Sequence, residues 1–144
     1  MSQSTRFAVS LLLLAELARA RPHSMTSAAL AESAGAHPVV VRRLLGRLAR
    51  AGLTEAKAGK DGGARLALAP KRISLRAVYA AVENGALISR GTPEGGADGA
   101  EQTLAPAINR ACRKAEKAFF KALEGMTLKD VMAGAADAKE EKAA

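Results

Sequence analysis

The chemistry that stands out in this sequence belongs to a run of arginines, Arg42, Arg43, Arg47 and Arg50. A guanidinium group forms paired hydrogen bonds with phosphate oxygens and with the exposed edge of guanine. No acidic residue occurs between Glu32 and Glu55, whereas a solvated helix surface normally mixes charges of both signs. The stretch therefore favours contact with a nucleic acid over the alternative of an ordinary exposed helix face.

The excess charge of the chain lies in the same half as these arginines. Residues 1–73 hold 12 basic and 4 acidic residues and carry the whole net charge of +8, because the 10 basic and 10 acidic residues that follow cancel. This asymmetry indicates a basic module joined to a neutral one. Double-stranded DNA is the expected polyanion. A membrane surface would require one basic amphipathic helix, and here the charge is spread over several elements.

Residues suited to catalysis or metal binding are sparse. The two histidines, His23 and His37, lie in or near the basic module, and no set of acid and base groups accompanies them. The glycine-rich stretch at 59–63 does not match the spacing of a phosphate-binding loop. We therefore predict no enzyme, no metal site and no cofactor. The single cysteine, Cys112, indicates a reducing compartment, the cytoplasm. It is either a small buried side chain or, alternatively, a redox-sensing thiol.

The arginines must be held by a packed scaffold, which begins with a helix predicted over residues 4–20. Phe7, Leu11, Leu14 and Ala18 recur at the spacing of one helix face. The apolar run at 7–18 also resembles a secretory signal, so a small exported protein is the alternative from another class. Glu16 inside the run argues against that alternative.

Two short helices joined by a tight turn follow. Thr26 is a good N-cap for a helix over 27–34 that stops at Gly35, and Pro38 opens a second helix that closes at Gly52. Val41, Leu44, Leu45 and Leu48 share one face of the second helix, and the arginines fall largely on the other. This is the pattern of a helix-turn-helix. Strands predicted at 53–58 and 64–68, joined by glycines, would form a basic β-hairpin, or wing.

The fold class is therefore mainly α with a small two-stranded wing: a winged helix-turn-helix plus a long dimerisation helix. The predicted division is a DNA-binding domain over 1–84, a flexible loop over 85–100, a dimerisation helix with a short terminal helix over 101–133, and a disordered tail over 134–144. The long helix repeats small and apolar residues with heptad-like spacing, which suits close packing against a second copy. The residues of this predicted interface are Leu104, Ile108, Ala111, Ala115, Ala118, Phe119 and Ala122.

Five short strings follow one another along the chain: RFA at 6–8, PVVVR at 38–42, LARAGL at 48–53, GKDGG at 59–63 and ISLRAV at 73–78. In this order and spacing the chain resembles the Rrf2 family of bacterial regulators of transcription over residues 4–133. The resemblance implies a homodimer whose two winged domains bind a pseudo-palindromic DNA operator, usually as a repressor. Cluster-binding members carry three cysteines near the long helix, but residues 85–106 contain none, and Thr103 and Pro106 match two ligand positions. We therefore expect a member without an iron–sulfur cluster.

In such a domain the arginine-bearing helix enters the major groove, where Arg42 and Arg43 would pair with guanines and Val39 and Val40 would touch thymine methyl groups. Phosphate contacts from other residues would position the domain without reading sequence. The predicted DNA contacts are Arg6, Thr26, Ser27, His37, Val39, Val40, Arg42, Arg43, Arg47, Lys57, Lys60 and Arg65.

Overall fold

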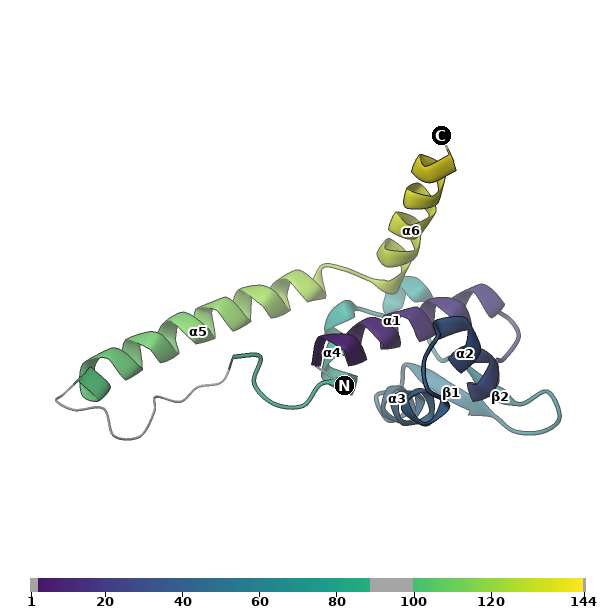
Figure 1. Ribbon diagram of the computed structural model, residues 1–144, viewed down its shortest axis with the longest axis horizontal. Coiled ribbons are helices and arrows are strands. Elements are labelled where there is room, and N and C mark those ends of the chain that lie inside the picture. Colours follow the sequence, from purple (N-terminus) through teal and green to yellow (C-terminus); the bar gives the residue numbers. More distant parts are fainter. Residues whose placement is uncertain (1–2, 89–99, 144) are drawn as a thin grey trace.

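The computed structural model describes residues 3–88 and 100–143 (Figure 1). Its elements in chain order are α1 (Gln3–Ala20), α2 (Ser27–Ala34), α3 (Pro38–Arg50), β1 (Thr54–Lys57), β2 (Gly63–Leu66), the 3-10 turn η1 (Pro70–Arg72), α4 (Leu75–Val82), α5 (Ala100–Glu124) and α6 (Leu128–Ala143). The predicted class, mainly α with a two-stranded wing, is confirmed. Among the described residues no helix is long and apolar enough to cross a membrane.

Helix α1 lies at the centre of the winged domain. Leu13, Leu14 and Leu17 have no exposed surface, and they share one core with the apolar side chains of α2, α3 and α4. The helix is apolar on most of its circumference, but only one face lies in the core. Leu12, on another face, is therefore 40% exposed. Residues 3–20 are thus a structural part of the domain, as the prediction of a core helix requires.

The helix-turn-helix forms for the local reasons that the sequence indicates. The Thr26 hydroxyl accepts a hydrogen bond from Ala29 N (3.1 Å) and so caps α2, which ends at Gly35 in the left-handed region with a φ of 59°. His37 caps α3 through Nδ1, which accepts from Val39 N at 3.2 Å. Both helices therefore begin and end within two residues of the predicted positions.

The wing is an antiparallel pair in which Thr54 lies opposite Leu66 and Lys57 opposite Gly63. It is anchored to the segment before α2, because Met25 N donates to Ala64 O (2.9 Å) and Ala64 N donates to Met25 O (2.8 Å). Gly63 makes this approach possible. Its φ is +153°, and a Cβ there would collide with the Met25 carbonyl.

Helix α5 leaves the winged domain, and α6 returns the chain to it (Figure 1). Near the end of α5, Phe119 and Phe120 pack edge-on against Tyr79 of α4. The centroid of the Tyr79 ring lies 5.4 Å from that of Phe119 and 5.6 Å from that of Phe120. Leu128 at the start of α6 is fully buried in the main core, and its N–H donates to Ile73 O at 2.9 Å. The terminal helix, which the sequence grouped with the dimerisation helix, therefore packs into the DNA-binding domain.

The C-terminal tail differs from the prediction. Residues 134–144 are predicted to be disordered, but α6 continues to Ala143. This segment consists largely of Ala, Lys and Glu, which are strong helix formers, so the helix continues although nothing packs against its exposed end. Of the predicted flexible loop, residues 85–88 are described and Ile88 N donates to Glu116 Oε1 of α5 (3.2 Å), whereas 89–99 lie outside the described residues.

One ion pair joins the start of α1 to the end of α4. Arg6 Nη2 lies 2.9 Å from Glu83 Oε2, and the Glu83 side chain is only 1% exposed. A buried carboxylate without a cation is costly because it loses its hydration and gains no compensating partner. This pair was not anticipated, because its members are 77 residues apart.

We expect Arg6→Met to lower the free energy of unfolding by about 3 kcal/mol, because it leaves the Glu83 carboxylate buried without its partner. Urea denaturation followed by circular dichroism measures the loss. The double variant Arg6→Met, Glu83→Leu should recover much of it. Wild-type stability of the single variant would show that the pair does not hold α1 to α4.

Candidate nucleic-acid interface

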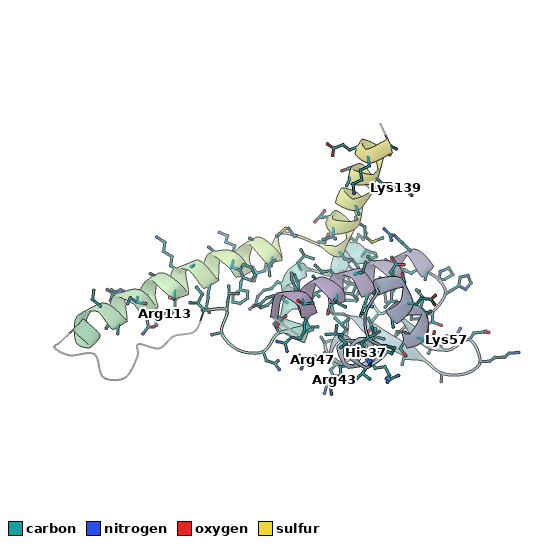
Figure 2. All side chains as sticks on the ribbon, in the orientation of Figure 1. His37, Arg43, Arg47, Lys57, Arg113 and Lys139 are labelled. Carbon is teal, nitrogen blue, oxygen red and sulfur yellow. The ribbon has the colours of Figure 1, made fainter. Side chains whose placement is uncertain are left out.

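Helix α3 separates its side chains into a buried and an exposed side. Val41, Leu44 and Leu48 are at most 2% exposed and face the core. Arg42 and Arg43 are exposed, and within the described parts of the chain neither has an ion pair or a hydrogen-bonded partner. Figure 2 shows Arg43 and His37 on the same edge of the molecule, at α3. The guanidinium groups are therefore free to bind a partner from solution.

The two valines predicted to touch bases are not equivalent. Val39 is 39% exposed at the start of α3. Val40 is half-buried and packs against the core. His37 is exposed, but its Nδ1 is occupied by the cap of α3, so only the rest of the ring faces outward. Contact of Val39 with a thymine methyl group fits this geometry better than contact of Val40.

Arg47 differs from the other arginines of α3. Its Nη1 donates to Val82 O at 2.6 Å, and its side chain is half-buried between α3 and α4. The last carbonyl groups of a helix lack partners within the helix, and a cation there also complements the helix dipole. Arg47 therefore ties α3 to the C-terminal end of α4. Its contact with DNA stays a prediction. To make that contact, its guanidinium would have to share or give up the hydrogen bond to Val82 O.

The wing places further cations near the same edge of the molecule. Lys57 and Lys60 are exposed, and Figure 2 shows Lys57 on the wing, on the same edge as Arg43 and His37. Arg65 is paired across the strands with Glu55 (2.7 Å), as their register requires. The two lysines are thus available for phosphate contacts, whereas Arg65 would have to share its charge with Glu55.

A cleft of about 430 Å³ lies between the wing tip and the turn before α2. Thr26, Lys57 and Lys60, all predicted contacts, line it together with His23 and Ser24, which were not predicted to contact DNA. The Ser24 hydroxyl donates to Asp61 O at 2.7 Å and closes the turn onto the wing. No sequence signal marks these two residues, because they reach the cleft only when the hairpin folds back over the turn.

The remaining predicted phosphate contacts have partners or partial cover. Arg6 is paired with Glu83. Ser27, the first residue of α2, is half-buried and lines a groove of about 350 Å³ between α3 and the wing. Both assignments stay predictions, and Arg6 has a structural function that the sequence did not indicate.

The residues do not fit an iron–sulfur cluster, which is held mainly by cysteine thiolates. Cys112 is the only cysteine and is half-buried on α5, whereas the two histidines lie on the turn before α2 and at the start of α3. Within residues 3–88 and 100–143, no three His, Cys, Asp or Glu side chains gather at one possible metal site.

Helix α5 carries an apolar stripe that its own domain leaves open. Leu104 is 58% exposed and Ile108 is 51% exposed. The alanines that continue the stripe, Ala111, Ala115, Ala118 and Ala122, are exposed as well. Phe119, predicted with them, instead packs on Tyr79 and Phe120 within the chain. Exposed large apolar side chains in a row are typical of a surface that a second protein covers.

We expect Arg47→Ala to lower the free energy of unfolding by about 1.5–3 kcal/mol, because it removes a charged hydrogen bond to a buried carbonyl. Arg43→Ala, the matched change on the same helix, should alter it by less than about 0.5 kcal/mol, since Arg43 is exposed and forms no hydrogen bond or ion pair with the described residues. Urea denaturation of the three proteins tests this. Equal stability of both variants would contradict a structural function of Arg47.

The comparisons with known proteins agree with this geometry. The Rrf2 family model, described as an iron-dependent transcriptional regulator, matches residues 2–134. Among solved structures, IscR of T. potens is similar with a TM-score of 0.73 and 22% identity, covering 96% of this chain and 90% of that chain. CymR, the global cysteine regulator of B. subtilis, is similar with a TM-score of 0.70 and 19% identity, covering 92% and 97%.

The oxidized form of Staphylococcus aureus CymR is also similar, with a TM-score of 0.68 and 22% identity over 92% of this chain and 96% of that chain. At these identities the structures show the shared winged-helix fold alone. No curated protein matches this sequence. Because the family model matches nearly all of the chain, the protein belongs to the Rrf2 family and is a DNA-binding regulator of transcription.

Proposed function

We propose that this Rrf2 regulator is a homodimeric repressor that reads a pseudo-palindromic operator and works without an iron–sulfur cluster. One observation carries the proposal: α3 exposes Arg42 and Arg43 without partners among the described residues while its opposite side is buried. A rigid helix with free guanidinium groups is suited to the major groove, where arginine pairs with guanine O6 and N7.

The surroundings of α3 support a specific orientation on DNA. With the N-terminal end of α3 foremost, Val39 and Arg42 would meet base edges, and the cleft of Thr26, Lys57 and Lys60 would hold a phosphate of the flanking backbone. Such phosphate contacts release bound counterions. The affinity for DNA should therefore fall steeply as the salt concentration rises.

The apolar stripe of α5 supports dimerisation. A pair of crossing helices would bury Leu104 and Ile108, which now face solvent, and the exposed alanines allow close approach of the two backbones. Two winged domains related by a two-fold axis would bind two half-sites that are inverted repeats of each other. The expected operator is therefore pseudo-palindromic. A dimer seated across a promoter would block transcription, which is the activity of a repressor.

The regulatory signal is proposed to be something other than iron–sulfur cluster assembly. A cluster needs several soft ligands, but this chain has one cysteine, on α5, and among the described residues no three His, Cys, Asp or Glu side chains gather at one site. The protein would act where the chromosome is, in the bacterial cytoplasm.

We expect Arg42→Ala to weaken binding to the operator by about 1–3 kcal/mol, because it removes one bidentate base contact. Fragments selected from the host genome supply the operator, and gel retardation at fixed salt measures the affinity. Arg72→Ala, which removes an equal charge from η1, is the control and should bind as the wild type does. Wild-type affinity of Arg42→Ala would remove the base-reading function from this residue.

We expect Ile108→Glu to convert the dimer to a monomer, because it places a carboxylate in the proposed apolar interface. Sedimentation equilibrium measures the mass, and gel retardation should show weaker operator binding in parallel. The helix content should be unchanged, since Ile108 is half exposed in the single chain. Arg110→Glu, on another side of α5, is the control. A wild type that is monomeric at all accessible concentrations would refute the proposed homodimer.

A further inference from the structure

A second surface, separate from α3, lies between the start of α4 and the second half of α5. It is a groove of about 620 Å³, lined by Arg76 of α4 and by Arg113, Glu116, Lys117, Phe120, Lys121 and Glu124 of α5. Figure 2 shows Arg113 on α5, well away from the edge that holds His37 and Arg43. Four cations thus surround one groove that the proposed contacts with DNA do not use.

The exposed surface of α5 is strongly one-sided in charge. Its five basic residues, Arg110, Arg113, Lys114, Lys117 and Lys121, are all exposed. Between Leu104 and Leu123 the only acidic residue is Glu116, which is 6% exposed and accepts a hydrogen bond from Ile88 N. Glu124 is the one exposed carboxylate of the groove. The three ion pairs formed among the described residues include none of these cations. Like charges gathered without partners favour an anion from solution.

Arg76 is already oriented to receive such an anion. Its Cζ lies over the Phe120 ring, 3.8 Å from the centroid, which is a cation–π contact, and the side chain is half-buried. A cation–π contact uses none of the N–H donors, and these donors have no hydrogen-bond partner among the described residues. A guanidinium held in this way is preorganised for paired hydrogen bonds to a phosphate or carboxylate.

The groove stays open in the proposed homodimer. Lys117 follows Ile108 by nine residues, about two and a half turns at 3.6 residues per turn, so the two side chains point to opposite sides of α5. Covering the apolar stripe therefore leaves the cationic groove in solvent.

Helix α4 connects the groove to α3. Arg76 lies in the first turn of α4, and Val82 at its end accepts the hydrogen bond from Arg47 of α3. A ligand that draws Arg76 toward α5 acts on the same short helix that holds α3.

We propose that this groove binds a small, multiply charged oxyanion, the phosphate or carboxylate part of a metabolite, with Arg76 as its main contact, and that its binding adjusts the affinity of α3 for DNA. The site itself does not depend on DNA binding, but its regulatory effect rests on the function proposed above. Arg113, Lys117 and Lys121 would neutralise the remaining charge of the anion.

The emission of tyrosine tests the site without DNA. The chain has one tyrosine and no tryptophan, and the ring of Tyr79 lies 5.6 Å from Phe120. The full chain is titrated at constant ionic strength with pyrophosphate and, separately, with citrate. We expect a saturable change in emission with at least one of them. Saturation by pyrophosphate alone indicates a phosphorylated ligand, and saturation by citrate alone indicates a carboxylate ligand.

Matched variants assign the response to the groove. Arg76→Gln and Lys117→Gln should each weaken anion binding, by about tenfold for Arg76, because the paired hydrogen bonds of its guanidinium are lost. Arg43→Gln removes the same charge from α3 and should bind the anion as the wild type does. Arg76→Lys, which keeps the charge and loses the planar fork, should stay weak. No saturable response to either anion, or equal binding by Arg76→Gln and the wild type, would overturn the site.

A second measurement tests the regulatory effect. At fixed ionic strength, the saturating anion should change the Kd for the operator by about tenfold in the wild type and leave it unchanged in Arg76→Gln. An equal change in both proteins would refute the link to α3. Failure of the wild type to bind any operator would refute the proposed function and leave the tyrosine titration as an independent result.

Discussion

Burial of one side of α3 in the core that it shares with α1, α2 and α4 is the interaction on which the rest of this structure depends. Val41 and Leu48 have no exposed surface, and they share a core with Leu13 and Leu14. Each such side chain stabilises the packing by about 1.5–3 kcal/mol when it is buried. Since α3 cannot roll without exposing these side chains, its arginines are held on the other side, in solvent. The rotation of one helix thus decides which residues can meet DNA.

Helix α4 organises the polar and aromatic contacts that join this core to the rest of the chain. Its last turn accepts a hydrogen bond from Arg47, its C-cap Glu83 pairs with Arg6, and Tyr79 packs against the base of α5. Three separate parts of the molecule therefore converge on a helix of eight residues. In the regulation proposed above, a change at α5 reaches α3 through this helix.

The sequence predicted those features that local physics controls. Thr26, Gly35 and Pro38 placed the helix ends, and the apolar period of Val41, Leu44 and Leu48 placed the buried side of α3. Features that depend on distant partners were missed. Arg47 looked equivalent to Arg43 in the sequence, and only the nearby end of α4 distinguishes it. Arg6 and Arg65 likewise acquired acidic partners that helix or strand periodicity alone does not reveal.

The sequence by itself therefore determined the helix-turn-helix, the wing, the excess of positive charge and the apolar stripe of α5, because capping, periodicity and charge are properties of neighbouring residues. Only the tertiary structure decided which cations lack a partner in the protein. It also decided that the wing is hydrogen-bonded to the turn before α2 and that the start of α6 packs into the main core. It also brought Arg76 onto Phe120 from a segment 44 residues away. The physical reason is that a contact between distant segments forms only when whole helices and strands pack together. The residues next to each partner in the sequence therefore do not indicate which distant residue it will contact.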